Sequence, residues 1–207
     1  MIIAIPSEQA IEETRVAATP ETVKKYIDWG FEVRIQKNAG NRAGFSDRDY
    51  QIAGAIIVDT PQELYRHADL ILKINAPLPE EIPNLSSGQI IIANFQALAH
   101  PAHIKELADK GLVCMALDML PRISRAQSMD VLSSQSNLSG YAAVIEAVSR
   151  LNKAVPLMMT AAGTVPPAKA LILGAGVAGL QAIATAKRLG AQVYAFDVRP
   201  QVKEQVE

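Results

Sequence analysis

The 207-residue chain lacks several features that would place it in a specialised class of protein. It has one cysteine, Cys114, so no intramolecular disulfide can form. Because Cys114 lies in the apolar run 112–116, we expect a buried, inert thiol, as is usual in a reducing, cytoplasmic compartment. Neither sign of charge dominates, since 20 Lys and Arg stand against 21 Asp and Glu. The net charge of −1 argues against a basic nucleic-acid-binding face, so no nucleic-acid partner is expected.

Long uninterrupted apolar runs are also missing. The first apolar residues end at Pro6, which is too early for the core of a signal peptide. The uncharged stretch 170–186 is shorter than the ~20 residues that a membrane helix needs, and glycines interrupt it. We therefore expect no membrane span, and we interpret this stretch as a buried strand followed by a helix.

Short apolar runs alternate with helical patterns along most of the chain. Thr19, Pro20 and Glu21 form a typical helix start, with a cap residue, an early proline and an early acid, and residues 101–110 give a second helical pattern. The apolar runs predict strands buried on both faces of a parallel sheet, and they lie at 2–5, 31–35, 55–58, 70–74, 90–93, 112–116, 170–173 and 192–196. This alternation predicts an α/β fold.

The alternation changes between residues 118 and 167. A polar loop at 121–135 precedes a helical pattern at 137–153 and a linker-like segment at 160–167. We predict a Rossmann-like or flavodoxin-like parallel-sheet domain at 1–136, a connecting helix and linker at 137–167, and the first half of a Rossmann NAD-binding domain at 168–207. A complete Rossmann fold has two halves, so the chain is either a fragment or one part of a larger protein.

A glycine motif marks the second domain. Gly174, Gly176 and Gly179 follow a predicted strand and open a predicted helix, which is the GxGxxG pattern of dinucleotide-binding turns. We expect the first glycine to allow the turn, the second to let a pyrophosphate approach the helix N-terminus, and the third to let the helix lie close to the strand. Asp197, 18 positions after Gly179, can accept both ribose hydroxyls and favours NAD(H), although nearby Arg199 could receive the phosphate of NADP(H). The alternative is that these glycines serve only a turn and that Asp197 is solvated.

The polar stretch 122–135 is typical, by composition alone, of a solvated surface loop. Together with the glycine motif, however, it resembles a known family. The segments 13–20, 38–45, 122–137 and 160–199 are similar to the NAD(H)-binding domain I of the alpha subunit of proton-translocating NAD(P) transhydrogenases, which share a superfamily with alanine dehydrogenase. The resemblance covers essentially the whole chain but only about the first half of that domain.

The resemblance implies roles for particular residues. Gln127 would hold the nicotinamide carboxamide or the ribose of the partner nucleotide, while Arg122 and Asp130, the other catalytic candidates, would order the loop and orient the ring. The remaining cofactor-binding candidates are Ser128, Met129 and Ser133 in the loop, and Val177, Val198 and Arg199 beside the glycines and Asp197.

The resemblance also implies an activity and its partners. Hydride would pass between NAD(H) on this chain and NADP(H) on the beta subunit, in a Si-/Re-type transfer driven by proton flow through a membrane subunit. The chain would form a homodimer and lie on the cytoplasmic face of the inner membrane, attached through its partner subunits.

Two other functions remain open. An alanine dehydrogenase-like enzyme is one, because Arg15 and Lys73 match positions that handle the amino acid there. The histidine of that enzyme is unmatched, since His100 and His103 come one place too late and are typical of a helix start. Asn75 stands where alanine dehydrogenase has a glutamate beside the lysine. We therefore expect Arg15 and Lys73 to be structural and to pair with local acids such as Glu13. The other function is a truncated NAD-binding module without turnover. Separately, no cluster of Cys, His or acidic residues in the sequence predicts a metal site.

Overall fold

The computed structural model describes residues 1–206 and divides into two compact units. The first unit runs from Met1 to Met129, and the second begins at Asp130. The sequence placed the end of the first domain at 136. The unit boundary comes earlier because the helix that opens the second unit begins at Val131 rather than at 137.

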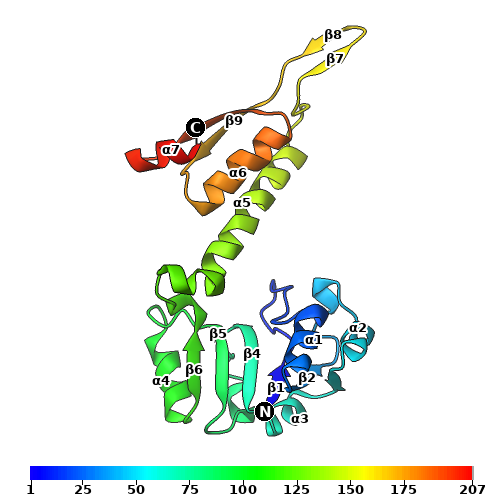
Figure 1. Ribbon diagram of the computed structural model, residues 1–207, viewed down its shortest axis with the longest axis vertical. Helices are drawn as coiled ribbons and strands as arrows, with labels where there is room; N and C mark the ends of the chain where they lie inside the picture. Colours follow the sequence, from blue (N-terminus) through cyan, green and yellow to red (C-terminus); the bar gives the residue numbers. More distant parts are fainter. Residues whose placement is uncertain (207) are drawn as a thin grey trace. The chain divides into compact units, whose positions relative to one another are not determined.

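A six-stranded parallel sheet forms the centre of the first unit (Figure 1). Its strand order is β3-β2-β1-β4-β5-β6, which is the order of a doubly wound Rossmann sheet. The strands are β1 (Ile2–Ile5), β2 (Glu32–Gln36), β3 (Ile56–Val58), β4 (Leu70–Asn75), β5 (Ile90–Asn94) and β6 (Val113–Ala116). All six agree with the predicted runs to within one residue at each end, and the predicted α/β class is confirmed.

Helices connect the strands, and their ends follow from local sequence. The Thr19 side chain accepts the Thr22 amide at 3.3 Å to cap α1, and Ser46 and Asp49 form a reciprocal capping box at α2. The sequence did not predict α2 and α3, because each is only six residues long. The helices are α1 (Pro20–Asp28), α2 (Asp47–Ile52), α3 (Pro61–Arg66) and α4 (Pro101–Asp109), with 3₁₀ turns η1 (Asn41–Ala43), η2 (Ile82–Asn84), η3 (Leu117–Met119) and η4 (Ser124–Met129).

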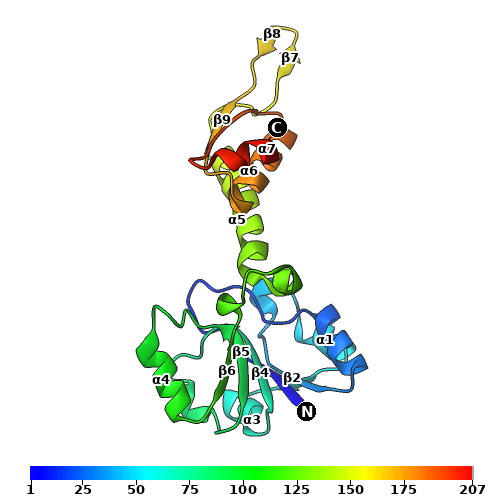
Figure 2. The same cartoon turned by 60° about the vertical axis from the view of Figure 1, so that its left-hand side comes forward.

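Two apolar clusters bury the two faces of this sheet. Ile3 and Ile5 of β1 belong to one cluster and Ala4 to the other, because successive side chains of a strand point to opposite faces. Both faces of the central strands are therefore covered, as in other all-parallel sheets. Figure 2 shows the helices α1, α3 and α4 around the sheet edges and faces.

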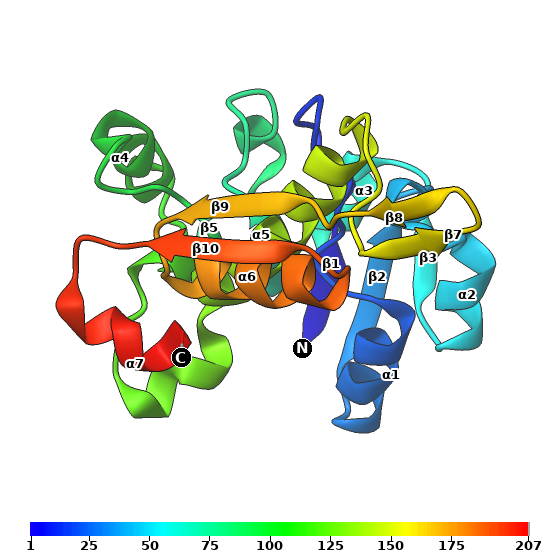
Figure 3. The same cartoon turned by 90° about the horizontal axis from the view of Figure 1, so that it is seen from above.

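The second unit contains one strand–helix–strand repeat. The strand β9 (Lys169–Leu173) leads into α6 (Val177–Arg188), which returns to β10 (Gln192–Phe196). β9 and β10 pair in parallel, with Leu171 beside Tyr194, and Figure 3 shows them side by side with α6 behind. The chain continues into the turn η5 (Pro200–Val202) and the helix α7 (Lys203–Val206). The predicted first half of a Rossmann fold is therefore present.

The β9–β10 sheet is covered on one face only, contrary to the expectation that all strands would be buried on both faces. Ala170, Ile172 and Val193 pack toward α5 (Val131–Ser149) and α6. The alternate side chains Leu171 and Phe196 are exposed, at 63% and 59%. The difference arises because, among residues 1–206, the helices of this unit pack on a single side of the pair.

Two segments of the connecting region differ from the sequence prediction. The segment 160–167, predicted as a linker, belongs to a β-hairpin formed by β7 (Met158–Thr160) and β8 (Gly163–Val165). Residues 124–135 of the predicted polar loop form η4 and the first turns of α5. Three- and six-residue elements, and helical turns within a polar segment, carry too little periodicity for sequence reasoning to detect. No helix within residues 1–206 is long and apolar enough to cross a membrane.

Gly140 fixes the crossing of α5 and α6. A Cβ atom at Gly140 would overlap the backbone carbonyl oxygen of Ala178, so the two helix backbones approach closely at this point. Val144 continues the contact along α5, and Ala182 and Ala186 continue it along α6. Small residues therefore set the distance between these helices.

Candidate nucleotide-binding site

The turn between β9 and α6 is shaped by two of the motif glycines. Gly174 has φ +92°, a left-handed conformation that L-residues with a Cβ adopt at a cost. A Cβ at Gly179 would overlap the carbonyl oxygen of Gly174 and would lie 3.7 Å from Cγ2 of Ile172. The start of α6 is thus held close to the end of β9, as the motif predicts.

The N-terminus of α6 suits an anion. Gly176 is the N-cap, and because it has no side chain it supplies no oxygen to the first amides of the helix. Those amides and the positive end of the helix dipole favour a negatively charged group such as a pyrophosphate. Gly176 has φ −80°, and a Cβ there would lie 3.8 Å from Nη2 of Arg199, so its lack of a side chain is not required by packing.

Asp197 lies directly after β10, beside this turn. Its Oδ2 accepts the Ala175 amide at 2.8 Å, which ties the end of β10 to the glycine turn. Arg199 donates to both carboxylate oxygens, from its backbone amide and Nε to Oδ1 and from Nη2 to Oδ2, at 2.8, 3.0 and 3.0 Å. The hydrogen bonds from Arg199, followed by that from Ala175, hold the pKa of the Asp197 carboxyl well below its usual value, so it is ionised at neutral pH.

Two neighbouring hollows meet at Arg199. One, of about 470 Å³, is lined by Ala175, Phe196, Asp197, Arg199 and Lys203 among others. The second, of about 350 Å³, is lined by Gly176, Val177, Leu180 and Gln201 and again by Arg199. Together they run from the α6 N-terminus to Asp197, where a dinucleotide would place its pyrophosphate and adenosine ribose. Val198 is 82% exposed and is not among the residues that line either hollow.

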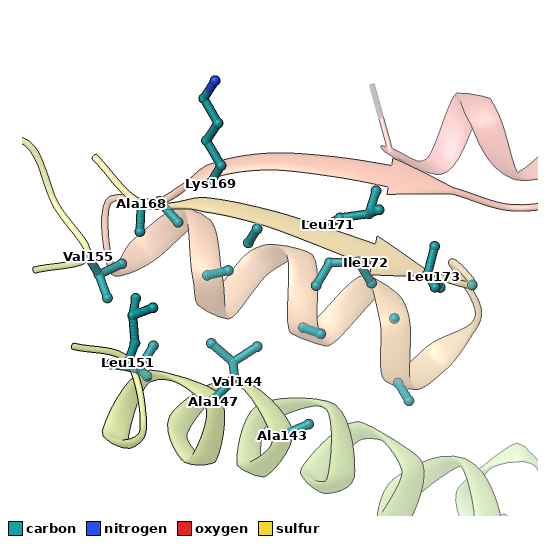
Figure 4. Close-up of a pocket in the computed structure, with 18 residues that line it drawn as sticks. Ala143, Val144, Ala147, Leu151, Val155, Ala168, Lys169, Leu171, Ile172 and Leu173 are labelled. Carbon is teal, nitrogen blue, oxygen red and sulfur yellow. The ribbon is translucent and has the colours of Figure 1, made fainter. Parts of the chain in front are cut away.

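A third hollow in this unit is apolar. It has about 480 Å³ and lies between α5, α6 and β9 (Figure 4). Its lining consists mostly of Ala, Val, Leu and Ile side chains, and the Lys169 side chain points away from it. A hollow without hydrogen-bonding side chains does not suit a dinucleotide, which needs a few well-placed polar groups.

The polar-loop candidates lie on either side of the boundary between the units. Arg122, Gln127, Ser128 and Met129 are exposed in the first unit, where the buried Ala126 anchors η4. Asp130 belongs to the second unit and is the N-cap of α5.

Asp130 and Ser133 are brought together by this cap. Oδ1 of Asp130 accepts the Ser133 amide at 2.9 Å, and Oδ2 accepts the Ser133 hydroxyl at 2.6 Å. The carboxylate therefore fixes the point at which the polar loop enters α5, because N-cap bonds define where a helix starts.

A second polar cluster occupies the switch point of the six-stranded sheet, between the carboxyl ends of β1 and β4, where doubly wound proteins commonly bind ligands. The ammonium of Lys73 lies 2.8 Å from Glu81 Oε1 and 3.9 Å from Glu8 Oε2, with its side chain 1% exposed. Glu8 accepts the amides of Ile74 and Asn75 at 2.7 and 3.4 Å. Burial is the main cause of a raised pKa at Glu8, while Lys73 acts in the opposite direction.

Arg15 is also paired within the chain. Its Nε and Nη2 donate to the two carboxylate oxygens of Glu13 at 2.7 and 2.6 Å, and Asn75 donates to Glu13 Oε2 at 3.0 Å. The expectation that Arg15 pairs with Glu13 is confirmed. Lys73 likewise pairs with acids of the chain, as expected, and these acids are Glu81 and the more distant Glu8.

Sequence reasoning missed Glu8 and Glu81, and also Tyr65, whose hydroxyl donates to Glu81 Oε1 at 3.0 Å. One signal was available: Lys73 interrupts an apolar strand, and a buried lysine requires a nearby acid. The identity of that acid could not be inferred, because Glu81 lies in the irregular segment after β4, where no periodicity relates it to the strand.

The remaining residues considered from the sequence are two histidines and the single cysteine. His100 precedes α4 and is exposed, as expected, and His103 lies 3.8 Å from Glu106 one turn later. Cys114 is only partly buried, contrary to the expectation of full burial, because it lies in the edge strand β6; its burial still raises the pKa of the thiol. Within residues 1–206 no group of three or more His, Cys, Asp or Glu is arranged to hold a metal ion.

A doubly wound parallel sheet and a second unit with a glycine turn facing an ionised aspartate define the class of nucleotide-binding α/β proteins. Residues 4–139 match the alanine dehydrogenase/PNT N-terminal domain, and residues 143–207 match the alanine dehydrogenase/PNT C-terminal domain. The chain therefore belongs to the alanine dehydrogenase/PNT family.

Similar proteins divide between two activities. The chain is 48% identical over 212 residues to the first part of the NAD(P) transhydrogenase alpha subunit of Rhodospirillum rubrum, covering 100% of this chain and 55% of that protein. A crystal structure of transhydrogenase from Sinorhizobium meliloti superposes with TM-score 0.95 and 49% identity, covering 100% of this chain and 61% of the other. Alanine dehydrogenase of Halomonas elongata is 34% identical over 200 residues, covering 95% of this chain and 53% of that enzyme. The chain thus spans about half the length of these relatives and is more similar to the transhydrogenases.

Proposed function

We propose that this chain is the NAD(H)-binding part of a proton-translocating transhydrogenase. It binds NAD(H) at the glycine turn and Asp197, and hydride passes to or from NADP(H) held on a beta subunit. The observation that carries the proposal is the position of the α6 N-terminus, which has no side-chain cap, close to the ionised Asp197. Two adjoining hollows extend from this helix end to Asp197. The higher identity to transhydrogenases than to alanine dehydrogenase supports the same assignment.

Each part of the site has a distinct task. Gly176 leaves room for the pyrophosphate at the α6 amides, and the Asp197 carboxylate accepts the hydroxyls of the adenosine ribose. Val177 and Arg199 line the same region, and Val198 follows Asp197. The bound nicotinamide supplies the hydride chemistry itself. This chain contributes to it by holding the nucleotide in a fixed position.

The polar loop positions the reacting ring in this proposal. Gln127 holds the nicotinamide carboxamide or the ribose of the partner nucleotide, and Arg122 and Asp130 order the loop, with Ser128, Met129 and Ser133 beside them. The Asp130 cap on α5 supports an ordering role. Transfer between two nicotinamides moves no proton at the reacting carbons, so bringing them within ~3–3.5 Å is the main catalytic task.

Alanine dehydrogenase activity is the second candidate, and the switch-point cluster argues against it. Lys73 and Arg15, the residues that would bind the substrate carboxylate, are engaged by Glu81 and Glu13. Asn75 donates to the same Glu13 and supplies no acid or base. An incoming keto acid would have to displace these partners, and Lys73 lies in a buried ion pair whose disruption is costly.

The assembly is part of the proposal. Sequence similarity to alpha subunits supports a partner beta subunit that holds NADP(H) and a membrane subunit that carries protons, with this chain bound peripherally on the cytoplasmic side. We also propose a homodimer. The β7–β8 hairpin supports self-association, because Leu157, Met158 and Met159 expose apolar side chains there, at 59%, 46% and 83%.

Gly176→Ala tests the nucleotide site. The methyl group fits the structure, since Gly176 has an ordinary φ of −80° and its nearest contact would be at 3.8 Å, but it would stand where the pyrophosphate approaches. We expect an unchanged unfolding temperature and NADH binding weakened at least tenfold, measured by NADH fluorescence. NADH affinity equal to that of the unmodified chain would overturn the assignment of the site. Ser139→Ala, on the exposed part of α5, is the matched control.

Activity separates the three functions. The chain is mixed with an NADP(H)-loaded beta-subunit domain, and transfer to an NAD⁺ analogue is followed by absorbance. Transfer that requires both components supports the proposal. Oxidation of NADH by pyruvate and ammonia would support alanine dehydrogenase activity. NADH binding without either reaction would support an NAD-binding module without turnover.

A further inference from the structure

Asp118 ties the start of the polar loop to the end of a sheet strand. Its Oδ1 accepts the backbone amide of Phe95 at 2.8 Å, although the two residues are 23 positions apart in the chain. Phe95 directly follows β5 and is 2% exposed, so the donor belongs to a fixed part of the core. The bond therefore holds η3, the turn that leads into the polar loop, against the end of β5.

This bond lies just past the end of the β5–β6 ladder. The two strands pair in parallel as far as Ala93 beside Ala116, and Figure 1 shows them next to each other. Two residues beyond each of these, the Phe95 amide meets the Asp118 carboxylate. A buried amide without an acceptor is costly, so the carboxylate lets the chain leave the sheet here while that donor stays bonded. Asp118 thus fixes the point at which the polar loop begins.

The backbone beside this bond is held in an unusual conformation. Gln96, the residue after Phe95, has φ +48°, a left-handed conformation that a residue with a Cβ adopts at a cost. Such a conformation persists where the surrounding contacts determine it. Asp118 fixes the amide before Gln96, and the Gln96 carbonyl accepts the amides of Ala99 and His100. The strand end that holds the loop is therefore a well-defined position.

Beyond Asp118, the polar loop is folded by local bonds. The amides of Leu120, Ile123 and Ala126 donate to carbonyls two or three residues earlier, so these bonds shape the loop without joining it to the sheet. Residues 121–125 are exposed, whereas Ala126 is buried in the first unit, at 5%. Gln127 comes directly after Ala126, so its position depends on where the loop starts and on the burial of Ala126.

We infer that Asp118 is a positioning residue for hydride transfer: by fixing where the polar loop leaves the sheet, it holds Gln127 in place against the nucleotide. The inference rests on the proposed function, which gives Gln127 its contact with the nucleotide. It goes further by assigning part of the geometry to a residue that acts only through the loop. A displacement of about 1 Å at the reacting groups can cost on the order of 100-fold in rate, so a remote tether can control the reaction.

Two substitutions of Asp118 test the inference, with this chain mixed with an NADP(H)-loaded beta-subunit domain. Asp118→Ala removes the acceptor, so we expect hydride transfer to slow at least about tenfold while NADH affinity, measured by fluorescence titration, stays within about twofold. Asp118→Asn keeps an oxygen that can accept the Phe95 amide, and its transfer rate should stay within about threefold of normal.

Thr60→Ala is the matched control. Thr60 follows β3, the edge strand opposite β6, and its hydroxyl accepts the Glu63 amide at 3.3 Å. This variant also removes one side-chain acceptor from a backbone amide of the first unit, but far from the polar loop in the order of strands. We expect a similar lowering of the unfolding temperature and an unchanged rate of hydride transfer.

Two further measurements separate positioning from a general loss of stability. The double variant Asp118→Ala with Gln127→Ala should be no more than about twofold slower than Gln127→Ala alone, because Asp118 acts through Gln127. Hydrogen–deuterium exchange of residues 119–129 should be faster in Asp118→Ala than in the unmodified chain and unchanged in Asp118→Asn. This second measurement does not depend on activity.

The outcomes separate the inference from the function beneath it. Normal transfer by Asp118→Ala, equal losses of rate and NADH affinity, or additive losses in the double variant would overturn the role of Asp118 and leave the proposed function intact. Unchanged exchange of the loop would overturn it as well. A slow Asp118→Asn would do the same, since the charge rather than the hydrogen bond would then matter.

Two remaining results are also decisive. If the unmodified chain supported no hydride transfer, the proposed function would fail together with the role given to Asp118, and loop exchange would still show whether Asp118 holds the loop. Should Asp118→Ala not fold, Asp118→Glu makes the same test, because it keeps the carboxylate but lengthens the link by one methylene. We expect it to slow transfer at least about threefold at unchanged NADH affinity, and normal transfer would overturn the inference.

Discussion

The ammonium of Lys73 donates two hydrogen bonds to Glu81, at 2.8 Å to Oε1 and 3.1 Å to Oε2. The same carboxylate accepts the Tyr65 hydroxyl at 3.0 Å and the Leu78 amide at 2.8 Å. Burial, reinforced by Glu81, raises the pKa of Tyr65, so its hydroxyl remains a donor. The positive charge of Lys73 at the switch point of the sheet is thus balanced by a carboxylate of the same chain. We expect this buried ion pair to stabilise the first unit.

Glu81→Gln should destabilise the first unit strongly. The change removes the carboxylate that accepts two hydrogen bonds from the buried Lys73 ammonium and leaves Glu8, 3.9 Å away, as a more distant charged partner. Breaking a buried pair in this way costs about 3–5 kcal/mol. Urea denaturation at pH 7 measures the loss. Glu80→Gln, one position away and exposed, is the control and should change the free energy of unfolding by less than about 0.5 kcal/mol. Equal stabilities of the two variants would contradict a stabilising role.

The Glu13–Arg15 pair should make stability depend on pH. Hydrogen bonds from the Arg15 side chain are the main cause of a Glu13 pKa of about 2, against an ordinary value of 4.5. A lowered pKa contributes stability that is fully present above pH 4.5 and is lost as pH falls toward 2. Because Arg15 is 43% exposed, we expect Glu13→Gln to cost about 1–2 kcal/mol at pH 7.

Denaturant titrations at several pH values test this expectation. The stability difference between Glu13→Gln and the unmodified chain should shrink as pH falls below 4.5 and should be nearly gone at pH 2. Glu12→Gln, exposed and adjacent, controls for the loss of an acidic residue. A difference that is constant with pH would show that Glu13 acts through packing instead of charge.

Gly140→Ala should destabilise the second unit although alanine is the better helix former. Its methyl group would overlap the Ala178 carbonyl oxygen and push α5 from α6. We expect a net loss of about 1–3 kcal/mol after the ~1 kcal/mol gained from helix propensity. Circular dichroism during thermal unfolding measures it, with Ser139→Ala as the neighbouring control. An increase in stability would mean that the helices are not in contact at Gly140.

Asp130 variants separate capping from catalysis. Asp130→Ala should lose about 1 kcal/mol of stability and reduce hydride transfer, because the cap that ends the polar loop is gone. Asp130→Asn still caps α5, so we expect near-normal stability and transfer within about threefold of normal. A stable but inactive Asp130→Asn would give the charge a direct part in the reaction and would refute the ordering role.

Gln127→Asn should reduce the rate of hydride transfer far more than the affinity for NADH. Shortening the side chain by one methylene moves its amide by about 1 Å, and such misplacement can cost on the order of 100-fold in rate. Stopped-flow transfer to an NADP(H)-loaded partner domain gives the rate, and fluorescence titration gives the affinity. Ser124→Ala, at the start of η4, is the control. Parallel losses of rate and affinity would make Gln127 a binding residue.

The elements that the sequence predicted well are those with a strong local signal. Strands β1 and β10 were predicted with their observed ends, because each is an apolar run bounded by polar or turn residues. The Thr19 cap and the φ of Gly174 were likewise expected from residue chemistry alone. The hairpin β7–β8 and the start of α5 were predicted incorrectly, because three-residue strands and a helix start within a polar segment carry little periodic signal.

The candidate sites divide in the same way. The glycine turn and Asp197 are close in space because a βαβ unit places strand ends side by side, which the sequence pattern implies. The occupation of Asp197 by Arg199, and of Lys73 by Glu81, depends on side-chain conformations and on an irregular segment after β4. No spacing rule predicts such contacts.

By itself the sequence determined the alternation of strands and helices, the parallel sheet, the dinucleotide turn and the family resemblance, because apolar periodicity and glycine positions are local properties of the chain. The tertiary structure decided most of the contacts between charged groups. A carboxylate selects its partner by distance and burial in the folded protein, where water no longer competes for it. The sequence could therefore show that Lys73 and Arg15 need acidic partners and could name Glu13, but the fold supplied Glu81 for Lys73 and Arg199 for Asp197.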